Sequence, residues 1–224
     1  MKIDNLWEGI FNYDTYVKGG TYSASDITSD IIQVKLRLLN PNHREMKYED
    51  KISAYIGSAI HQRIEQWIEA ENAFGLTNME SEVKLKYKNL SGTCDLILDK
   101  KTIVDYKTGK EENIKRGLKD STKWITQLSI YRFLANRNGY KIEPLAYIAW
   151  LCVDTNKHGI HEIELLSDEE TIKVIKNFMT EIEKPVEDMP KCNLCIQFMH
   201  RFCGVKDKCP HWVVDKDFSS IDTW

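Results

Sequence analysis

The sequence has no long hydrophobic run, and this absence sets the first limits on the chain. An α-helix needs about 20 consecutive apolar residues to span a bilayer, and no segment of the 224 residues approaches that length. The N-terminal segment MKIDNLWEGIFNYDTY also lacks the basic start and apolar core of a signal peptide. We therefore expect a cytoplasmic protein that has no membrane partner.

Internal repeats, low-complexity linkers, a P-loop and helicase motifs are missing as well. If the protein works with an ATP-driven motor, the motor is therefore another chain. Hydrophobic residues make up 42% and charged residues 29% of the sequence. This composition is ordinary for a globular protein of this length, which is enough for one sizeable domain or for one domain with a small appendage.

A strong excess of one charge is also lacking, because the formal net charge is −3. That value argues against a chain that binds nucleic acid through basic charge over its whole surface. The middle of the chain differs, because eleven Lys or Arg stand against six Asp or Glu between Lys84 and Lys123. This local balance of +5 favours a basic face. The alternative is an ordinary solvated surface on which the excess of positive charge arises by chance.

Hydrophobic periodicity predicts helices and strands that alternate along the chain. Helical spacing and capping residues indicate helices over residues 25–40, 48–74, 121–138 and 167–184. Alternation and apolar runs indicate strands over residues 80–89, 93–99, 101–108, 143–154 and 159–166. The first three strands should form an antiparallel meander, and strand 143–154 should be central because it is apolar on both faces. The fold class is therefore α/β or α+β, a mixed sheet with helices on its faces.

Three charged residues stand in these strands where a core is expected. Asp105 and Lys107 share a strand face because residues i and i+2 point the same way. Asp95 lies on the preceding strand, close enough across the hairpin to join them. Two carboxylates suit Mg²⁺, and a lysine can orient water or neutralise developing charge. The three residues predict a phosphodiester-hydrolysing site. The alternative is a surface hairpin whose charges face solvent or pair with each other.

Other polar residues on the helices and strands are candidates for the same site. His61 lies at the edge of its helix's apolar face and can offer a neutral imidazole to a metal, although a satisfied core histidine is the plainer alternative. Glu65 follows one turn later on the same side. Gln127 and Tyr131 are neighbours on one helix face, and Glu82 on the first strand is a second-rank acid.

The chain resembles the PD-(D/E)xK nuclease superfamily, specifically its RecB-like branch. Four motifs carry the resemblance in the family's order: Gly57 to His61, Gly92 to Asp95, Asp105 to Lys107 with Thr108-Gly109, and Gln127 to Tyr131. Each motif alone is unspecific, but the ordered set is hard to obtain by chance. The resemblance implies a restriction-endonuclease-like fold.

The resemblance also implies a Mg²⁺- or Mn²⁺-dependent DNA nuclease that acts in repair, recombination or phage DNA processing. The implied metal ligands are His61, Asp95, Asp105 and the backbone carbonyl of Tyr106, while Gln127 and Tyr131 support the site and the DNA backbone. We favour an exonuclease over an endonuclease, on DNA that is single-stranded or has free ends, with a helicase or recombination protein as a compatible partner chain. The alternative is a catalytically silent nucleic-acid-binding module of the same fold in a larger complex. The intact acids and lysine favour catalysis.

Four cysteines near the C-terminus form a separate group, Cys192, Cys195, Cys203 and Cys209. Four thiols within 18 residues fit a closed tetrahedral zinc site, with His200 and His211 as spare ligands. Some RecB-like nucleases instead hold a [4Fe–4S] cluster that uses one N-terminal cysteine, which the matching segment here lacks. We favour zinc over iron–sulfur, and free thiols remain the plain alternative. The predicted organisation is a nuclease domain over residues 1–188, with a cysteine-rich tail over residues 189–224 packed on it.

Overall fold

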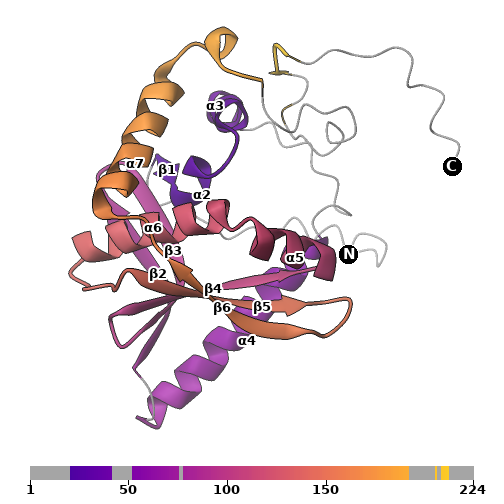
Figure 1. Ribbon diagram of the computed structural model, residues 1–224, viewed down its shortest axis with the longest axis vertical. Coiled ribbons are helices and arrows are strands. Elements are labelled where there is room, and N and C mark those ends of the chain that lie inside the picture. Colours follow the sequence, from indigo (N-terminus) through magenta and orange to yellow (C-terminus); the bar gives the residue numbers. More distant parts are fainter. Residues whose placement is uncertain (1–20, 42–51, 76–77, 192–204, 206–207, 212–224) are drawn as a thin grey trace, which may run out of the picture.

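The computed structural model describes residues 21–41, 52–75, 78–191, 205 and 208–211, and within them it contains one mixed six-stranded sheet flanked by helices (Figure 1). The strands are β1 (Tyr22–Ser23), β2 (Met79–Tyr87), β3 (Leu90–Leu98), β4 (Thr102–Gly109), β5 (Leu145–Cys152) and β6 (His158–Glu164). The helices are α2 (Ala24–Ile27), α3 (Ile31–Leu39), α4 (Ile52–Ala73), α5 (Glu111–Lys119), α6 (Thr122–Arg137) and α7 (Asp168–Glu183), followed by a 3₁₀ turn, η3 (Val186–Asp188). The predicted fold class is confirmed.

The sheet runs in the order β1-β3-β4-β5-β6, and β2 pairs with the other edge of β3. Strands β2, β3 and β4 form the predicted antiparallel meander. Strand β5 lies between β4, to which it is parallel, and β6, to which it is antiparallel, so it is central as predicted. The β3–β4 ladder is short, because only Leu96–Leu98 pair with Thr102–Val104. The two strands then separate, and we call this opening the fork.

Helices cover the two faces of the sheet unequally (Figure 1). Helix α6 buries Leu128, Ile130 and Leu134 completely in the main core, and α5 lies beside it. Helix α4 on the opposite face buries only Ile68 among its described side chains. The sequence predicts a continuous apolar face on α4, yet Trp67 is 52% exposed. Among the described residues α4 is the one helix on this side, and Tyr55 and Ile56 of its apolar stripe are exposed as well. No helix in the described part of the chain is long and apolar enough to cross a membrane.

The prediction of one helix over residues 25–40 is wrong in one respect. The chain forms two short helices there, α2 and α3. The hydroxyls of Thr28 and Ser29 both donate hydrogen bonds to the Ser25 carbonyl, at 3.2 and 2.7 Å. Such local side-chain bonds compete with helix propagation, and α2 ends at this point. Its N-cap is Ser23, two residues earlier than expected, in a capping box with Asp26.

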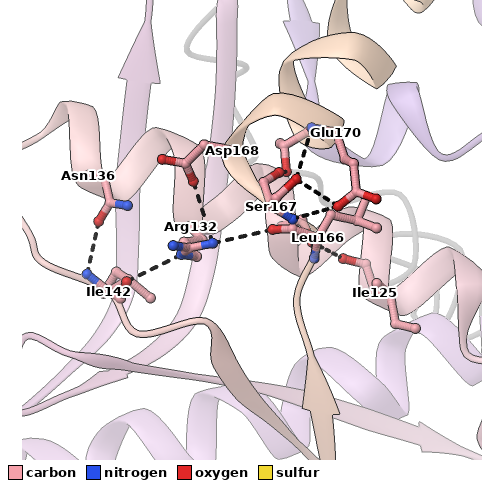
Figure 2. A network of polar contacts seen from close by, with 10 residues as sticks. Ile125, Arg132, Asn136, Ile142, Leu166, Ser167, Asp168 and Glu170 are labelled. Carbon is pink, nitrogen blue, oxygen red and sulfur yellow. Dashed lines mark hydrogen bonds and ion pairs between the residues drawn. The ribbon is translucent and has the colours of Figure 1, made fainter.

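Polar side chains of α6 hold the chain at the entry to β5 and at the entry to α7 (Figure 2). Arg132 donates to the carbonyl oxygens of Ile142 and Leu166, at 3.3 and 3.2 Å. Asn136 accepts a 2.8 Å bond from the Ile142 N–H, and the buried Ser129 hydroxyl accepts one of 2.9 Å from the Leu166 N–H. Helix α6 thus fixes both connections by satisfying their backbone groups.

We predict that Ser129→Ala lowers the free energy of unfolding by about 1–3 kcal/mol, because it leaves the Leu166 N–H without its acceptor. Urea unfolding measures this loss. Thr126→Ala is the control one turn earlier on α6, since Thr126 is only half-buried and its hydroxyl donates to the Thr122 carbonyl of its own helix, not to another segment. Equal losses in the two variants would contradict the role of Ser129 as a tie between segments.

Candidate active site

The candidate site lies at the fork, where the β3–β4 ladder stops. The last backbone pair on this side is Leu96 with Val104. Beyond this pair the Asp95 side chain replaces the backbone as the acceptor on β3, and its Oδ2 accepts a 2.8 Å hydrogen bond from the Tyr106 N–H. This bond joins the separating strands and fixes one carboxylate oxygen of Asp95. It leaves Oδ1 turned toward other ligands.

A local reversal of the sheet faces brings a second acid, Glu82, beside Asp95. Residues i and i+2 of a strand normally share a face. Cys94, however, packs into the main core under α6, whereas Leu96 packs with α4 on the other face. Glu82, opposite Asp95 in the ladder, has a left-handed backbone with φ of 47°. The register is the same on both sides of this point, so the reversal occurs within one step. It places both acids on the α4 side.

His61 completes a group of three potential metal ligands with these acids. Its Nδ1 lies 3.7 Å from Glu82 Oε1 and 3.8 Å from Asp95 Oδ1. One ligand atom from each residue lies within 4.8 Å of the others. The Tyr106 ring meets the imidazole edge-to-face at 5.4 Å and limits its orientation. Two carboxylates with an imidazole fit a divalent cation such as Mn²⁺, and the carboxylates also suit Mg²⁺.

Asp105 and Lys107 form the second part of the site on β4. The Lys107 Nζ lies 2.5 Å from Asp105 Oδ2, so the two side chains share a face as strand periodicity predicts. Asp105 is only 2% exposed. Although Oδ2 is paired with the ammonium, it makes no hydrogen bond of good geometry within the described chain. A buried carboxylate oxygen left in this state is a ready acceptor for an added cation or water.

The carboxylates raise the proton affinity of the site. Burial, followed by the negative charge of Asp105, raises the pKa of Asp95 from 3.8 to about 7. The pKa of His61 is raised as well, chiefly by its interaction with Glu82 and then by the charge of Asp95, against the opposing effect of burial. The Asp95 shift thus comes from burial first and from neighbouring negative charge second, whereas the His61 shift comes chiefly from the carboxylates. A bound cation would offset the part that is due to negative charge.

Two motif glycines allow close approaches around the fork. A Cβ at Gly57 would lie 3.0 Å from the Thr108 hydroxyl oxygen, so this glycine lets α4 approach β4. A Cβ at Gly92 would lie 2.7 Å from the Tyr131 ring, so α6 approaches β3 only because no side chain intervenes. Both glycines therefore bring a helix of the motif set close to the strands that carry the acids.

Comparison with protein families shows the superfamily of the chain. The model of the PD-(D/E)XK nuclease superfamily matches residues 19–210, which is most of the chain. The chain belongs to this superfamily. No curated relative matches it in sequence.

Solved structures share the fold of this PD-(D/E)XK chain at low sequence identity. The protein SSO0001 is 17% identical, with a TM-score of 0.62, and the match covers 95% of this chain and 98% of that one. A protein from Eubacterium rectale with a provisional exonuclease assignment is 13% identical, with a TM-score of 0.52 and coverage of 90% and 92%. Identities this low show a common fold and nothing finer.

The remaining candidate residues of the PD-(D/E)XK motifs fall into two groups. Gln127 and Tyr131 are in contact as predicted, because the Gln127 amide donates a 3.1 Å bond to the Tyr131 hydroxyl. Tyr131 is 7% exposed, and burial together with the charges of Asp105 and Asp95 raises its pKa. Glu65 is half-buried on α4 and lies outside the group of three ligands.

Most of the predicted cysteine site lies outside the described residues. Cys192, Cys195 and Cys203 are among these, as is the spare ligand His200. Cys209 is described and half-buried, and it packs against a small apolar cluster that α3 shares with the C-terminal segment. His211 has its Nε2 3.0 Å from the Met189 carbonyl oxygen. The described tail residues therefore contact the body of the protein.

We predict that Mn²⁺ binding strengthens as the pH rises from 6 to 8. With the Asp95 pKa raised to about 7, a cation must displace a proton at pH 6 but not at pH 8. An aspartate at its ordinary value of 3.8 would contribute no change in this range. Calorimetric titration measures the affinity, and Asp95→Asn is the control, with weaker binding and a flatter pH profile. An affinity that is constant from pH 6 to 8 in the unmodified protein would contradict the prediction.

Proposed function

We propose that this chain is a metal-dependent deoxyribonuclease that hydrolyses phosphodiester bonds at the fork. One observation carries the proposal. Three potential ligands from α4, β2 and β3 converge within 4.8 Å, and the Asp105–Lys107 pair lies on the adjacent strand β4. A member of this fold that lacks catalytic activity does not require both acids and the lysine. This chain contains all three, Asp95, Asp105 and Lys107.

The proposed ligands for Mg²⁺ or Mn²⁺ are His61, Glu82, Asp95 and Asp105, with the backbone carbonyl of Tyr106. Glu82 rises from a second-rank candidate to a proposed ligand, because its oxygen lies in the group of three. When bound, such a cation polarises the phosphodiester and lowers the pKa of a nearby water.

The chain's own residues perform the remaining tasks. Lys107, 24% exposed at its side chain, holds its ammonium beside the Asp105 carboxylate, where it can orient the attacking water and stabilise developing negative charge. The bond from the Tyr106 N–H holds Asp95 in one orientation, and the Tyr106 ring holds His61. Such fixed positions lower the entropic cost of bringing the groups together. Gln127 and Tyr131 support this arrangement from α6.

We further propose exonuclease rather than endonuclease action, on DNA that is single-stranded or has free ends. The deep burial of Asp105 supports this choice, since a free strand end reaches a recessed site more readily than an intact duplex. The provisional assignment of the Eubacterium rectale protein is of the same class. The settings that we propose are repair, recombination or phage DNA processing, where a helicase or recombination protein would be a separate chain.

We predict that Asp105→Asn and Lys107→Met each lower the cleavage rate at least about 100-fold, because each removes a group that acts on the reacting phosphate. DNA binding should change only a few-fold. The assay uses end-labelled single-stranded, double-stranded and circular DNA with Mg²⁺ or Mn²⁺, and EDTA should stop cleavage.

Asp99→Asn and Lys101→Met are matched controls, since they change the same residue types in the exposed turn between β3 and β4. Cleavage by either site variant at the rate of these controls would overturn the site assignment. Cleavage of circular DNA would overturn the preference for exonuclease action.

We also propose that Cys192, Cys195, Cys203 and Cys209 bind one structural metal, which we expect to be zinc rather than a [4Fe–4S] cluster. Four thiolates fill every position of a tetrahedral site and leave none open for catalysis. On this proposal, residues 189–224 form a metal-anchored tail on a nuclease domain of residues 1–188. The packing of Cys209 against the α3 cluster supports a tail that docks.

We predict one zinc per chain in a colourless protein, measured by elemental analysis after anaerobic purification. Cys209→Ser should lower the zinc content and the melting temperature, because metal binding to so short a segment is coupled to its folding. Cys152→Ala is the control, since that thiol is buried in β5, far along the chain from the tail, and its loss should leave the zinc content unchanged. Iron with a broad visible absorbance would contradict the assignment of zinc. The absence of both metals would contradict the proposed metal site.

A further inference from the structure

Two lysines on β2 lie on the same face of the strand as the metal-ligand group. Val83 and Leu85 point into the main core under α6. Because side chains alternate along a strand, Lys84 and Lys86 point to the opposite face. That is the face on which Glu82 meets His61 of α4. The two lysines therefore continue in line from the site, with steps of about 7 Å between alternate residues.

This lysine row, Lys84 and Lys86, is accessible to a ligand. Both side chains are exposed, and neither forms an ion pair with any residue that the structure describes. Helix α4 bonds β2 at the far end of the strand, where the Asn72 amide donates a 2.6 Å bond to the Met79 carbonyl. Lys88 does not extend the row, because its ammonium lies over the Tyr87 ring at 5.6 Å.

The positive charge of the lysine row offsets part of the negative charge of the acids at the fork. Three carboxylates near the fork repel a phosphate backbone, and burial strengthens that repulsion. Two ammonium groups along the approach offset it at the point where the polyanion leaves the site. Their spacing is comparable with that of successive phosphates in an extended nucleic-acid strand, so each can contact one phosphate.

We propose that Lys84 and Lys86 bind the phosphate backbone of the strand being cut, on the side that extends along β2 from the fork. This inference rests on the proposed nuclease function and adds the path that the substrate takes. The scissile phosphate lies at the metal-ligand group, and the next two phosphates lie along the row. The lysines position the strand by charge and make no contact with the reacting atoms, so they act on binding and not on the chemical step.

Salt dependence tests the lysine row, because each phosphate contact that is lost reduces the slope of log affinity against log salt by about 0.7 for a single strand and about 0.9 for a duplex. The double variant Lys84→Gln/Lys86→Gln should therefore reduce the slope by about 1.4 on a labelled 20-nucleotide single strand. Fluorescence anisotropy in EDTA measures binding without turnover. A reduction of about 1.8 on a 20-base-pair duplex would identify a duplex as the bound form.

The matched control is Lys173→Gln/Lys176→Gln, which removes two exposed lysines from α7. It should leave the slope unchanged. In a cleavage assay with Mn²⁺, the β2 double variant should raise KM while kcat stays within about two-fold. Thermal unfolding of both variants checks that the fold is retained.

An unchanged slope in the β2 variant, or an equal reduction of the slope in the α7 control, would contradict phosphate binding by Lys84 and Lys86. These outcomes are distinct from failure of the nuclease itself. If the slope falls as expected but the unmodified protein cleaves nothing, the row stands as a binding surface and the proposed activity fails. If the unmodified protein cleaves DNA and the slope does not change, the activity stands and the row fails.

Discussion

The candidate site depends on one hydrogen bond, from the Tyr106 N–H to the Asp95 carboxylate. Strands β3 and β4 part after three paired residues, and the N–H of the half-buried Tyr106 would otherwise have no acceptor on β3. Asp95 supplies the acceptor and in return has one oxygen fixed. The same separation opens the space in which His61 from one side and Lys107 from the other can approach the acids. A regular β3–β4 ladder would close that space.

The sequence predicts the elements of this region well because their patterns are local. The strand pattern of β2, the hairpin of β3 and β4 and the apolar run of β5 each depend on a short segment, and these predicted strands are confirmed. Helix α5 was missed, because its nine residues are largely polar and Ile114 is its only buried residue. The split between α2 and α3 was missed because hydroxyl bonds to a single carbonyl, and not the apolar spacing, decide it.

Glu82 shows why the site was harder to predict than the fold. Plain alternation continued from the start of β2 would put its side chain on the α6 side, away from His61. Its left-handed backbone and the matching reversal at Asp95 change that, and nothing in the sequence pattern marks the step. Asp105 and Lys107 were predictable because the i, i+2 rule held along β4. Convergence of residues from three separate elements requires the tertiary structure.

Charge at the fork suggests an order of events in the proposed reaction. Burial and neighbouring carboxylates raise the pKa of Asp95, and the carboxylates raise that of His61, so both groups take up protons more readily than usual and protons would compete with a cation there. A phosphate backbone would add to the negative charge of the acids, and a divalent cation held by His61, Glu82 and Asp95 would offset that charge. The lysine row lies outside this competition, since its charge does not depend on the cation. The exposed Lys84 and Lys86 could therefore hold a strand near the fork without a cation, whereas the acids would favour a phosphate at the fork only if a cation offset their charge. On the proposed path, binding of the strand by the lysine row is therefore separate from its cleavage at the fork.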